Sequence, residues 1–473
     1  MPHDDTLRLR RAVVHFTFTF DSVLDPSMLH GKLESVVRRE GWKKVGARLR
    51  RNRSGCLEYH IPSKFCSDCL AVAYSHAEYA MKIGQHPKAS RLLASRKGLA
   101  ITTSLGEFDE LMRPLGCLRK GGDYLSADVP QLGLYIIAFT DATLVTIYYP
   151  HTLLDGVGLS ALLHSWSLAV QNPKAELPTP CDTDPLTELD NRLQSPEARR
   201  KENYEWRISI LKWVLYGTRN LSRVLFPAMQ PRTVFIPAAQ MTRLRETAER
   251  DLVTENNSDE KVFISDGDII CAWWARLALS HVSRHSSKPV ALVNAFSLRH
   301  LLDKQYSGRI HLSNLFDFAT VLLKTKVIHN EPLGYVASQI RHIIKTSSKS
   351  EKLQAFASWS RASNLGIPPF FGSTNMHVIC YSNLAKAKLF DLDFSAAIVG
   401  GAPCDSSNTG RPVNVQVRSY GPTAVDMNWI TGKDADGNYW LSCNTSKRNW
   451  KLIEQRLEQE QQDVDGNTMT CVL

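Results

Sequence analysis

The sequence places a histidine and an aspartate four residues apart, at His151 and Asp155, and a glycine, Gly156, directly after the aspartate. Histidine has an unperturbed pKa near neutrality, so its imidazole can take a proton from a hydroxyl group that attacks an activated acyl carbon. Asp155 could hold that imidazole in one tautomer, or it could brace the loop by pairing with an arginine elsewhere in the chain. The alternative is that neither residue is catalytic: the histidine only packs against its neighbours, and the aspartate only caps the following helix.

The residues on either side predict that this motif lies on a turn between a strand and a helix. The preceding run, Thr143–Ile147, is rich in β-branched residues and indicates a buried strand. After Gly158 the apolar residues recur with helical spacing. These residues are Leu159, Leu162, Leu163, Trp166 and Val170. Because Pro150 and the glycines mark the change of direction, we expect His151 on a loop held by rigid elements, a common place for catalytic residues.

The segment from His151 to Gly156 has the pattern H-x-x-x-D-G, which resembles the motif of the BAHD-type acyl-CoA-dependent acyltransferases and their fungal relatives. Further regions resemble segments of that family in the same order. Gly46–Arg50 is similar to the G-R-L strand of the family, and Val293–Arg299 is similar to its central arginine-bearing strand. Tyr381–Asn383 is similar to the S-N/S-W segment, and Leu389–Phe394 is similar to the segment that leads to D-F-G-W-G. The resemblance therefore runs over nearly the whole chain.

The sequence departs from the family pattern in two places. Where the family has D-F-G-W-G, this chain has D-F-S-A-A at Asp393–Ala397, and Leu384 stands where a tryptophan usually follows Ser-Asn. These departures concern the lining of the site, and they leave the expected fold and the motif at His151 unchanged.

The resemblance implies an α/β fold of two chloramphenicol-acetyltransferase-like domains, with mixed sheets flanked by helices and an active-site channel between the domains. Acyl-CoA would enter this channel from one side and the acceptor from the other, and the two would meet at His151. As the general base, His151 would deprotonate the acceptor hydroxyl, which then attacks the thioester carbonyl. Coenzyme A would leave as a thiol.

Other residues are expected to support this site. In the family the motif aspartate pairs with an arginine, so the resemblance implies that Asp155 and Gly156 support the site structurally. Asp393 is expected to pair with Arg299, in a second contact that is also structural.

The tetrahedral intermediate of such a reaction needs hydrogen-bond donors for its oxyanion. The resemblance makes Ser382 and Asn383 the candidates for lining the substrate or oxyanion region. We expect no metal site. Cys66–Cys69 has a C-x-x-C pattern, but no second pair of ligands stands nearby at the spacing that zinc requires.

The substrate classes follow from the fungal secondary-metabolite branch of the family, which the chain resembles in the segments Ala71–His76 and His86–Pro87. This resemblance implies an O-acyltransferase that uses acetyl-CoA, or another acyl-CoA, as the donor. The acceptor would be a small hydroxylated metabolite of terpenoid or alkaloid type. The resemblance also implies a monomer with no permanently bound cofactor.

Length and charge set further bounds. A chain of 473 residues is too long for one core and fits two domains or one large double domain. The formal net charge of +10 favours anionic partners, which include nucleic acid, acidic lipids and the phosphates of coenzyme A. Because the basic run Arg38–Arg53 lacks zinc-finger, helix-turn-helix and interleaved aromatic signatures, we expect no nucleic-acid partner.

A proline-rich, polar stretch predicts the domain boundary. It contains Pro173, Pro178, Pro180, Pro185 and Pro196. Such a composition is typical of a linker or a long crossover. We therefore expect an N-terminal domain over residues 1–205, which carries the motif and ends in this crossover, and a C-terminal domain over residues 206–473.

The sequence also bears on location. The N-terminus lacks the apolar core of a signal peptide, and no window approaches about 18 uncharged apolar residues, so we expect no membrane span. Ten cysteines without a secretory signal indicate reduced thiols. The expected location is the cytoplasm.

Two other functions remain open on the same fold. A condensation-domain-like enzyme that forms amides or esters would show H-H-x-x-x-D-G, but Pro150 stands where the first histidine would be. A non-catalytic relative that binds a small molecule would explain the altered segment at Asp393, although it leaves the intact motif at His151 unexplained.

Overall fold

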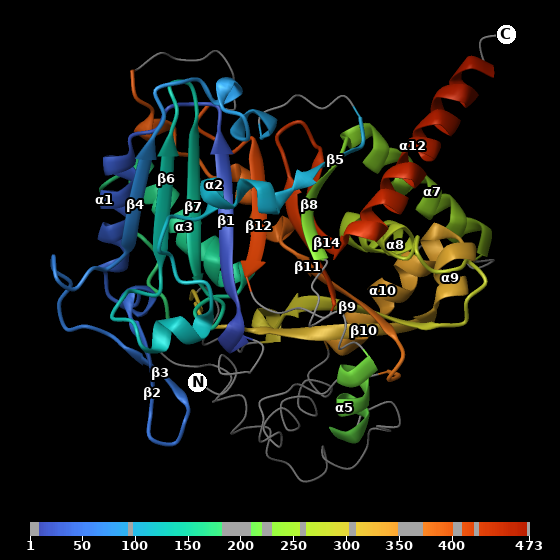
Figure 1. Ribbon diagram of the computed structural model, residues 1–473, viewed down its shortest axis with the longest axis horizontal. Coiled ribbons are helices and arrows are strands. Elements are labelled where there is room, and N and C mark those ends of the chain that lie inside the picture. Colours follow the sequence, from blue (N-terminus) through green and yellow to red (C-terminus); the bar gives the residue numbers. More distant parts are fainter. Residues whose placement is uncertain are drawn as a thin grey trace.

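The computed structural model describes residues 9–92, 98–181, 210–219, 229–255, 262–301, 309–348, 372–400, 409–420 and 425–470. Within these ranges the strands form two large sheets that stand next to each other in Figure 1, and a small hairpin. Helices pack against both large sheets. The predicted α/β architecture with two sheets is therefore confirmed.

The first sheet has five strands in the order β12-β1-β7-β6-β4. Their bounds are β1 Val13–Phe20, β4 Ala73–Glu78, β6 Gly133–Ala138, β7 Thr143–Pro150 and β12 Asn414–Tyr420. β1 runs antiparallel to β7 with Thr17 opposite Thr146. Alternate residues of a strand face opposite sides of the sheet, so Phe16 and Phe18 of β1 both lie on the side that carries the core.

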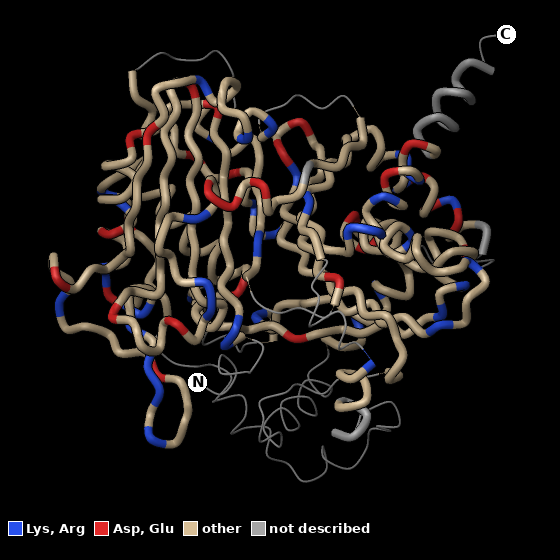
Figure 2. The backbone as a smooth tube through the Cα atoms, viewed as in Figure 1, with Lys and Arg blue, Asp and Glu red and all other residues tan. Residues whose placement is uncertain are grey.

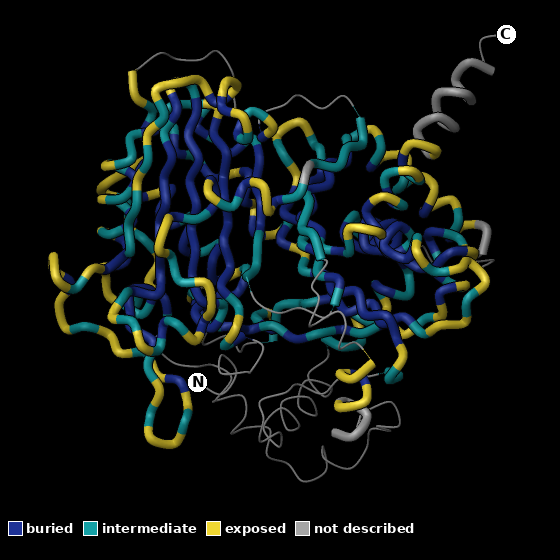
Figure 3. Tube along the Cα trace, in the orientation of Figure 1, coloured by how far each residue is buried: buried dark blue, intermediate teal, exposed yellow. Residues whose placement is uncertain are grey.

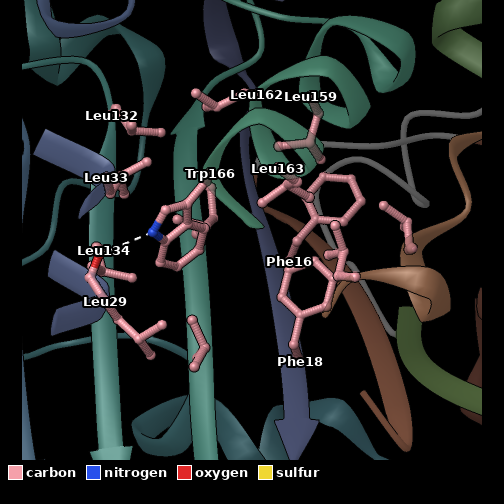
Figure 4. Close-up of a cluster of buried hydrophobic side chains, with 14 of the residues drawn as sticks. Phe16, Phe18, Leu29, Leu33, Leu132, Leu134, Leu159, Leu162, Leu163 and Trp166 are labelled. Carbon is pink, nitrogen blue, oxygen red and sulfur yellow. Dashed lines mark hydrogen bonds between the residues drawn. The ribbon is translucent and has the colours of Figure 1, made fainter. Parts of the chain in front are cut away.

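Two helices, α1 (Pro26–Val37) and α3 (Gly156–Gln171), cover that side of the first sheet. Figure 4 shows Trp166 of α3 among leucines of α1, α3 and β6 and phenylalanines of β1. The indole Nε1 donates a hydrogen bond of 2.9 Å to the carbonyl of Leu29 in α1, so this buried side chain leaves no polar atom unpaired.

The second sheet has seven strands in the order β10-β9-β11-β13-β14-β8-β5. Their bounds are β5 Ala100–Ser104, β8 Met229–Ile236, β9 Pro289–Ser297, β10 Phe316–Lys324, β11 His377–Asn383, β13 Asp426–Lys433 and β14 Tyr439–Ser446. The helices of this half are α7 Ala238–Glu255, α8 Asp266–Ala278, α9 Thr325–Asn330, α10 Leu333–Ser347 and α12 Lys447–Thr470. Strands β1 and β7 of the first sheet are buried along their whole length (Figure 3), and helix α8 of the second half is buried over most of its length.

Each large sheet takes one strand from the other half of the sequence. β5 precedes the proline-rich stretch but pairs with β8 of the second sheet, and β12 follows it but pairs with β1 of the first (Figure 1). The two halves are therefore interlocked through the sheets. The predicted boundary near residue 205 lies outside the described residues, as do Pro185 and Pro196, and it stays a prediction.

The small hairpin of β2 (Arg48–Arg51) and β3 (Leu57–His60) projects from the body and carries part of the basic run (Figures 1 and 2). Some of this charge is structural, because Arg48 is buried and donates to the carbonyls of Gly46 and Leu70 at 2.9 and 2.8 Å. The remaining short helices include α2 (Asp109–Met112) and α5 (Ile210–Arg219). None of the helices in the described ranges is long and apolar enough to cross a membrane.

The packing of α3 makes a prediction about stability. Trp166→Ala should lower the free energy of unfolding by about 3–5 kcal/mol, because it removes a fully buried indole and leaves a cavity. Leu168→Ala is the matched control on the same helix, since Leu168 is 40% exposed, and it should change stability by no more than about 0.5 kcal/mol. Urea denaturation of both variants measures the difference, and similar losses in the two would contradict this view of the core.

Candidate active site

His151 lies directly after β7 and before α3, as the sequence predicts. Its backbone N–H donates a hydrogen bond of 2.9 Å to the carbonyl of Ala12, which precedes β1. The side chain is half-buried, and its ring centroid lies 6.2 Å from that of Phe316, the first residue of β10. The histidine therefore stands where the end of the first sheet meets the beginning of a strand in the second.

Asp155 caps the N-terminus of α3. Its carboxylate accepts hydrogen bonds from the backbone N–H groups of Val157 and Gly158 at 3.1 and 2.8 Å. A carboxylate in this position satisfies N–H groups that have no partner within the helix, and the positive end of the helix dipole favours its charge. This cap fixes the direction in which the chain leaves the motif.

The same carboxylate forms a bidentate ion pair with Arg299, with N–O distances of 2.8 and 2.9 Å. It also accepts a bond of 2.9 Å from the backbone N–H of Leu315. Asp155 is only 5% exposed, so this is a buried pair held by directed hydrogen bonds. The arginine partner that the resemblance implied for the motif aspartate is Arg299.

The segment 311–315 packs against the motif turn. Arg299 donates to the carbonyls of His311 and Ser313 at 2.8 and 3.1 Å, which fixes this segment beside Asp155. Asn314 then donates from its side-chain amide to the carbonyls of His151 and Thr152 at 3.0 and 3.2 Å. One amide therefore holds the backbone carbonyls of the candidate base and of the residue that follows it.

Sequence reasoning missed Asn314. No motif marks this residue, and its importance arises only because Arg299 brings its segment against the turn. Tyr59 of β3 was missed as well, because no motif marks it: its hydroxyl donates a hydrogen bond of 2.6 Å to the carbonyl of Thr152.

The glycines of the motif allow these segments to approach the start of α3. A Cβ atom on Gly156 would lie 2.4 Å from Cδ2 of Leu384, and one on Gly158 would lie 2.6 Å from the carbonyl oxygen of Leu312. Both distances are far below contact. Leu384, which replaces the tryptophan of the family, is thus packed on the motif glycine itself.

The predicted pair between Asp393 and Arg299 is wrong. Asp393 accepts a hydrogen bond of 2.8 Å from the side chain of Gln171, the last residue of α3, and its carbonyl accepts one of 2.8 Å from Ser167. Arg299 binds at the other end of the same helix. Because a helix rises 1.5 Å per residue, the 16 residues of α3 separate its two ends by about 24 Å.

Ser382 and Asn383 lie at the end of β11, but they face opposite sides of the second sheet. Ser382 pairs with Ala295 of β9, which pairs with Phe318 of β10, so Ser382 shares a face with Phe318 and with Phe316. That face is the one on which Phe316 approaches His151.

Asn383 faces the other way. Its Oδ1 accepts a hydrogen bond of 3.0 Å from the backbone of Ala385, and its Nδ2 occupies the space in which a Cβ on Gly267 of α8 would lie. The two side chains therefore cannot line one oxyanion site together, and Ser382 is the one that lies on the side of Phe316.

Asp317 is a buried carboxyl beside the site that sequence reasoning also missed. It lies between Phe316 and Phe318 in β10 and faces the opposite side of the sheet. Burial raises its pKa to about 8, and the hydrogen bond from the backbone N–H of Phe318 offsets this effect only in part. Within the described residues, no group of three or more His, Cys, Asp or Glu side chains could hold a metal ion.

No family model matches the sequence. The chain is 34% identical over 472 residues to the transcriptional regulator calD of Penicillium decumbens, in an alignment that covers 97% of this chain and 94% of that protein. It is 33% identical over 483 residues to the acetyltransferase sphE of Aspergillus fumigatus, covering 96% of this chain and 93% of that protein.

Among solved structures, the chain is similar to TRI101 of F. sporotrichioides in its complex with coenzyme A and T-2. The TM-score is 0.65 at 17% identity, and the superposition covers 97% of each chain. At 17% identity, the similarity to this structure shows the fold of the chain. The two relatives that are more than 30% identical over almost the whole chain show the family to which it belongs.

The placement of Arg299 makes a prediction for double-mutant cycles. Arg299→Ala combined with Asp155→Ala should show a coupling energy of about 1–3 kcal/mol in urea denaturation, because each single change leaves a buried charge without its partner. Arg299→Ala combined with Asp393→Ala should be additive within about 0.5 kcal/mol, because the two residues do not touch. Coupling only in the second cycle would restore the pairing expected from the sequence.

The raised pKa of Asp317 predicts how stability depends on pH. An acid whose pKa is higher in the folded protein stabilises the fold below its unfolded value of about 4. That contribution is lost as the pH rises through about 8, by up to about 1.4 kcal/mol per pH unit.

Asp317→Asn should remove this slope and keep the bond to Phe318, so the variant gains stability relative to wild type between about pH 5 and about pH 7.5. Asp391→Asn, at an exposed position, is the control. Urea denaturation at both pH values measures the change, and parallel curves for wild type and Asp317→Asn would contradict the prediction.

Proposed function

The chain belongs to the BAHD-type family of acyl-CoA-dependent acyltransferases, and we propose that it transfers the acetyl group of acetyl-CoA to a hydroxyl of a small secondary metabolite. The observation that carries this proposal is the intact motif, with His151 on a turn that Asp155, Arg299 and Asn314 fix in place. The name of the relative sphE, an acetyltransferase, supports the acetyl donor. TRI101, which has a similar fold, was solved in complex with coenzyme A, and this also supports an acyl-CoA donor.

In the proposed reaction His151 acts as the general base. Its imidazole takes the proton of the acceptor hydroxyl while the hydroxyl oxygen attacks the carbonyl carbon of the thioester. The tetrahedral intermediate collapses, the carbon–sulfur bond breaks, and the proton passes to the sulfur of coenzyme A. The products are the acetyl ester and free coenzyme A.

The surroundings of His151 support this role. Hydrogen bonds from Asn314 and to Ala12 fix the backbone of the residue on both sides, so the imidazole is presented from a rigid turn. Holding a base in the reactive geometry contributes to rate because less motion has to be lost in the transition state. Asp155 and Gly156 support the turn and do not take part in the proton transfer.

Ser382 is our candidate for the oxyanion donor. Its side chain is half-buried on the face shared with Phe316, and its hydroxyl makes no hydrogen bond to any residue that the structure describes. A hydroxyl in this state can donate to a developing oxyanion without breaking another bond. We assign no such role to Asn383, since its amide contacts α8.

The aromatic residues on this face support an acceptor with a large apolar skeleton, of terpenoid or alkaloid type. Phe316 and Phe318 are both only partly buried, and their ring centroids are 5.4 Å apart in an edge-to-face arrangement. Partly exposed aromatic rings beside a base provide apolar contact for a ring system that carries one hydroxyl.

The proposal includes a monomer that acts in the cytoplasm without a permanently bound cofactor or a metal ion. The cysteines support a reducing location, since every cysteine among the described residues is a free thiol.

A second candidate function is a non-catalytic protein of the same fold that binds a small molecule. The observation that favours it is the name of the relative calD, a transcriptional regulator that is 34% identical to this chain. Such a protein would bind acyl-CoA or a metabolite at the same turn without turnover.

Thiol release from acetyl-CoA tests the two functions. Purified protein is incubated with acetyl-CoA and a pooled extract of hydroxylated metabolites, and wild type is compared with His151→Ala. We expect acceptor-dependent release that His151→Ala lowers by about 10²–10⁴-fold, with one metabolite gaining the mass of an acetyl group.

His164→Ala is the matched control, because His164 lies on α3 and binds the carbonyl of Ala387 at 3.0 Å, away from the turn. It should keep most of the activity. No release with any acyl-CoA from protein shown to be folded would favour the non-catalytic function.

A further inference from the structure

Two cysteines of the first half form the ends of one tight turn. Cys66 and Cys69 lie in the connection between β3 and β4, and their backbones exchange both hydrogen bonds, at 3.0 and 3.1 Å. Ser67 and Asp68 form the tip of the turn. Nothing in the proposed acyl transfer uses either thiol.

The geometry of this turn is compatible with a disulfide. Residues that exchange both backbone hydrogen bonds across an antiparallel pair have Cα atoms about 5.5 Å apart and side chains on the same face. Disulfides join residues whose Cα atoms are about 4.4–6.8 Å apart. Cys66 and Cys69 are both free thiols, and neither is buried.

The residues on both sides of the turn are fixed to the body of the protein. The carbonyl of Phe65 accepts a hydrogen bond of 2.7 Å from Arg38, and the carbonyl of Leu70 accepts one of 2.8 Å from the buried Arg48. The ring of Phe65 is buried against Gly46, where an added Cβ would lie 2.9 Å from it. Because the chain is already ordered here, little conformational entropy remains to be lost when the thiols join.

Other cysteines are less suited to react. The thiolate is the nucleophile in disulfide exchange, so a raised pKa and burial both slow a cysteine. Burial raises the pKa of Cys271 and Cys443 well above the ordinary value and that of Cys117 to about 11. Cys56 in the β2–β3 loop is exposed, but it is not half of such a pair.

We propose that Cys66 and Cys69 form a reversible disulfide in exchange with small-molecule disulfides such as oxidised glutathione. The exposed Cys66 attacks a sulfur of the small disulfide as its thiolate, forms a mixed disulfide and releases one thiol. Cys69 then attacks the sulfur of Cys66 and releases the second thiol. In total the protein loses two hydrogen atoms, and one small disulfide becomes two thiols.

Reversible disulfide formation would give this turn a redox role that is separate from acyl transfer. Disulfides in a reducing compartment are mostly transient and respond to the state of the thiol pool. The turn follows β3, whose Tyr59 holds the motif turn through Thr152. The oxidised turn would therefore follow, along the chain, a strand that supports the candidate site.

Mass spectrometry after exposure to oxidised glutathione tests the proposal. Wild type, Cys66→Ser, Cys69→Ser and Cys56→Ser are equilibrated with mixtures of reduced and oxidised glutathione, quenched in acid and digested. We expect wild type and Cys56→Ser to lose two hydrogens in the peptide that contains both Cys66 and Cys69, reversibly with dithiothreitol.

Cys69→Ser should instead carry one glutathione on Cys66, at a level at least about tenfold above that of wild type, because no second thiol displaces it. Mixed disulfides on Cys66 in wild type at the level of Cys69→Ser, with no internal crosslink, would overturn the proposal. A crosslink from Cys56 to either cysteine would overturn it as well. The readout does not depend on the acyl transfer reaction.

Discussion

The buried ion pair between Asp155 and Arg299 is the contact on which the candidate site depends. Asp155 belongs to the turn after the first sheet, and Arg299 follows a strand of the second, so one interaction joins the two halves at the motif. Moving both charges out of water costs several kcal/mol per ion, and only close geometry with further hydrogen bonds offsets that cost. Asp155 meets this condition through the backbone N–H groups of Val157, Gly158 and Leu315.

The exchange of strands gives this contact a rigid frame. β12, from the C-terminal part of the sequence, extends the first sheet, and β5, from the N-terminal part, extends the second sheet. Each half therefore completes the sheet of the other, and the two cannot separate without breaking strand pairs. A site built from both halves, with His151 on one and Phe316 on the other, needs such a frame to keep its geometry.

The altered D-F-S-A-A segment has a structural place far from the histidine. Asp393 binds the C-terminal end of α3, and Phe394 is buried against Trp166 and Phe20, with ring centroids 4.7 and 5.7 Å away. The changed residues therefore lie near the end of the helix opposite to His151. Their divergence from the family does not touch the motif, and it gives no support to a loss of catalysis.

The sequence by itself determined the local elements and the place of the motif. The alternation of Phe16 and Phe18, the helical spacing in α3 and the turn at His151 are local patterns, because strand and helix periodicity depend on neighbours along the chain. The tertiary structure alone decided which residues meet across the fold. It paired Arg299 with Asp155 and not with Asp393, brought the unmarked Asn314 to the turn, and divided Ser382 from Asn383. These outcomes depend on packing and strand register between distant segments, which no local pattern contains.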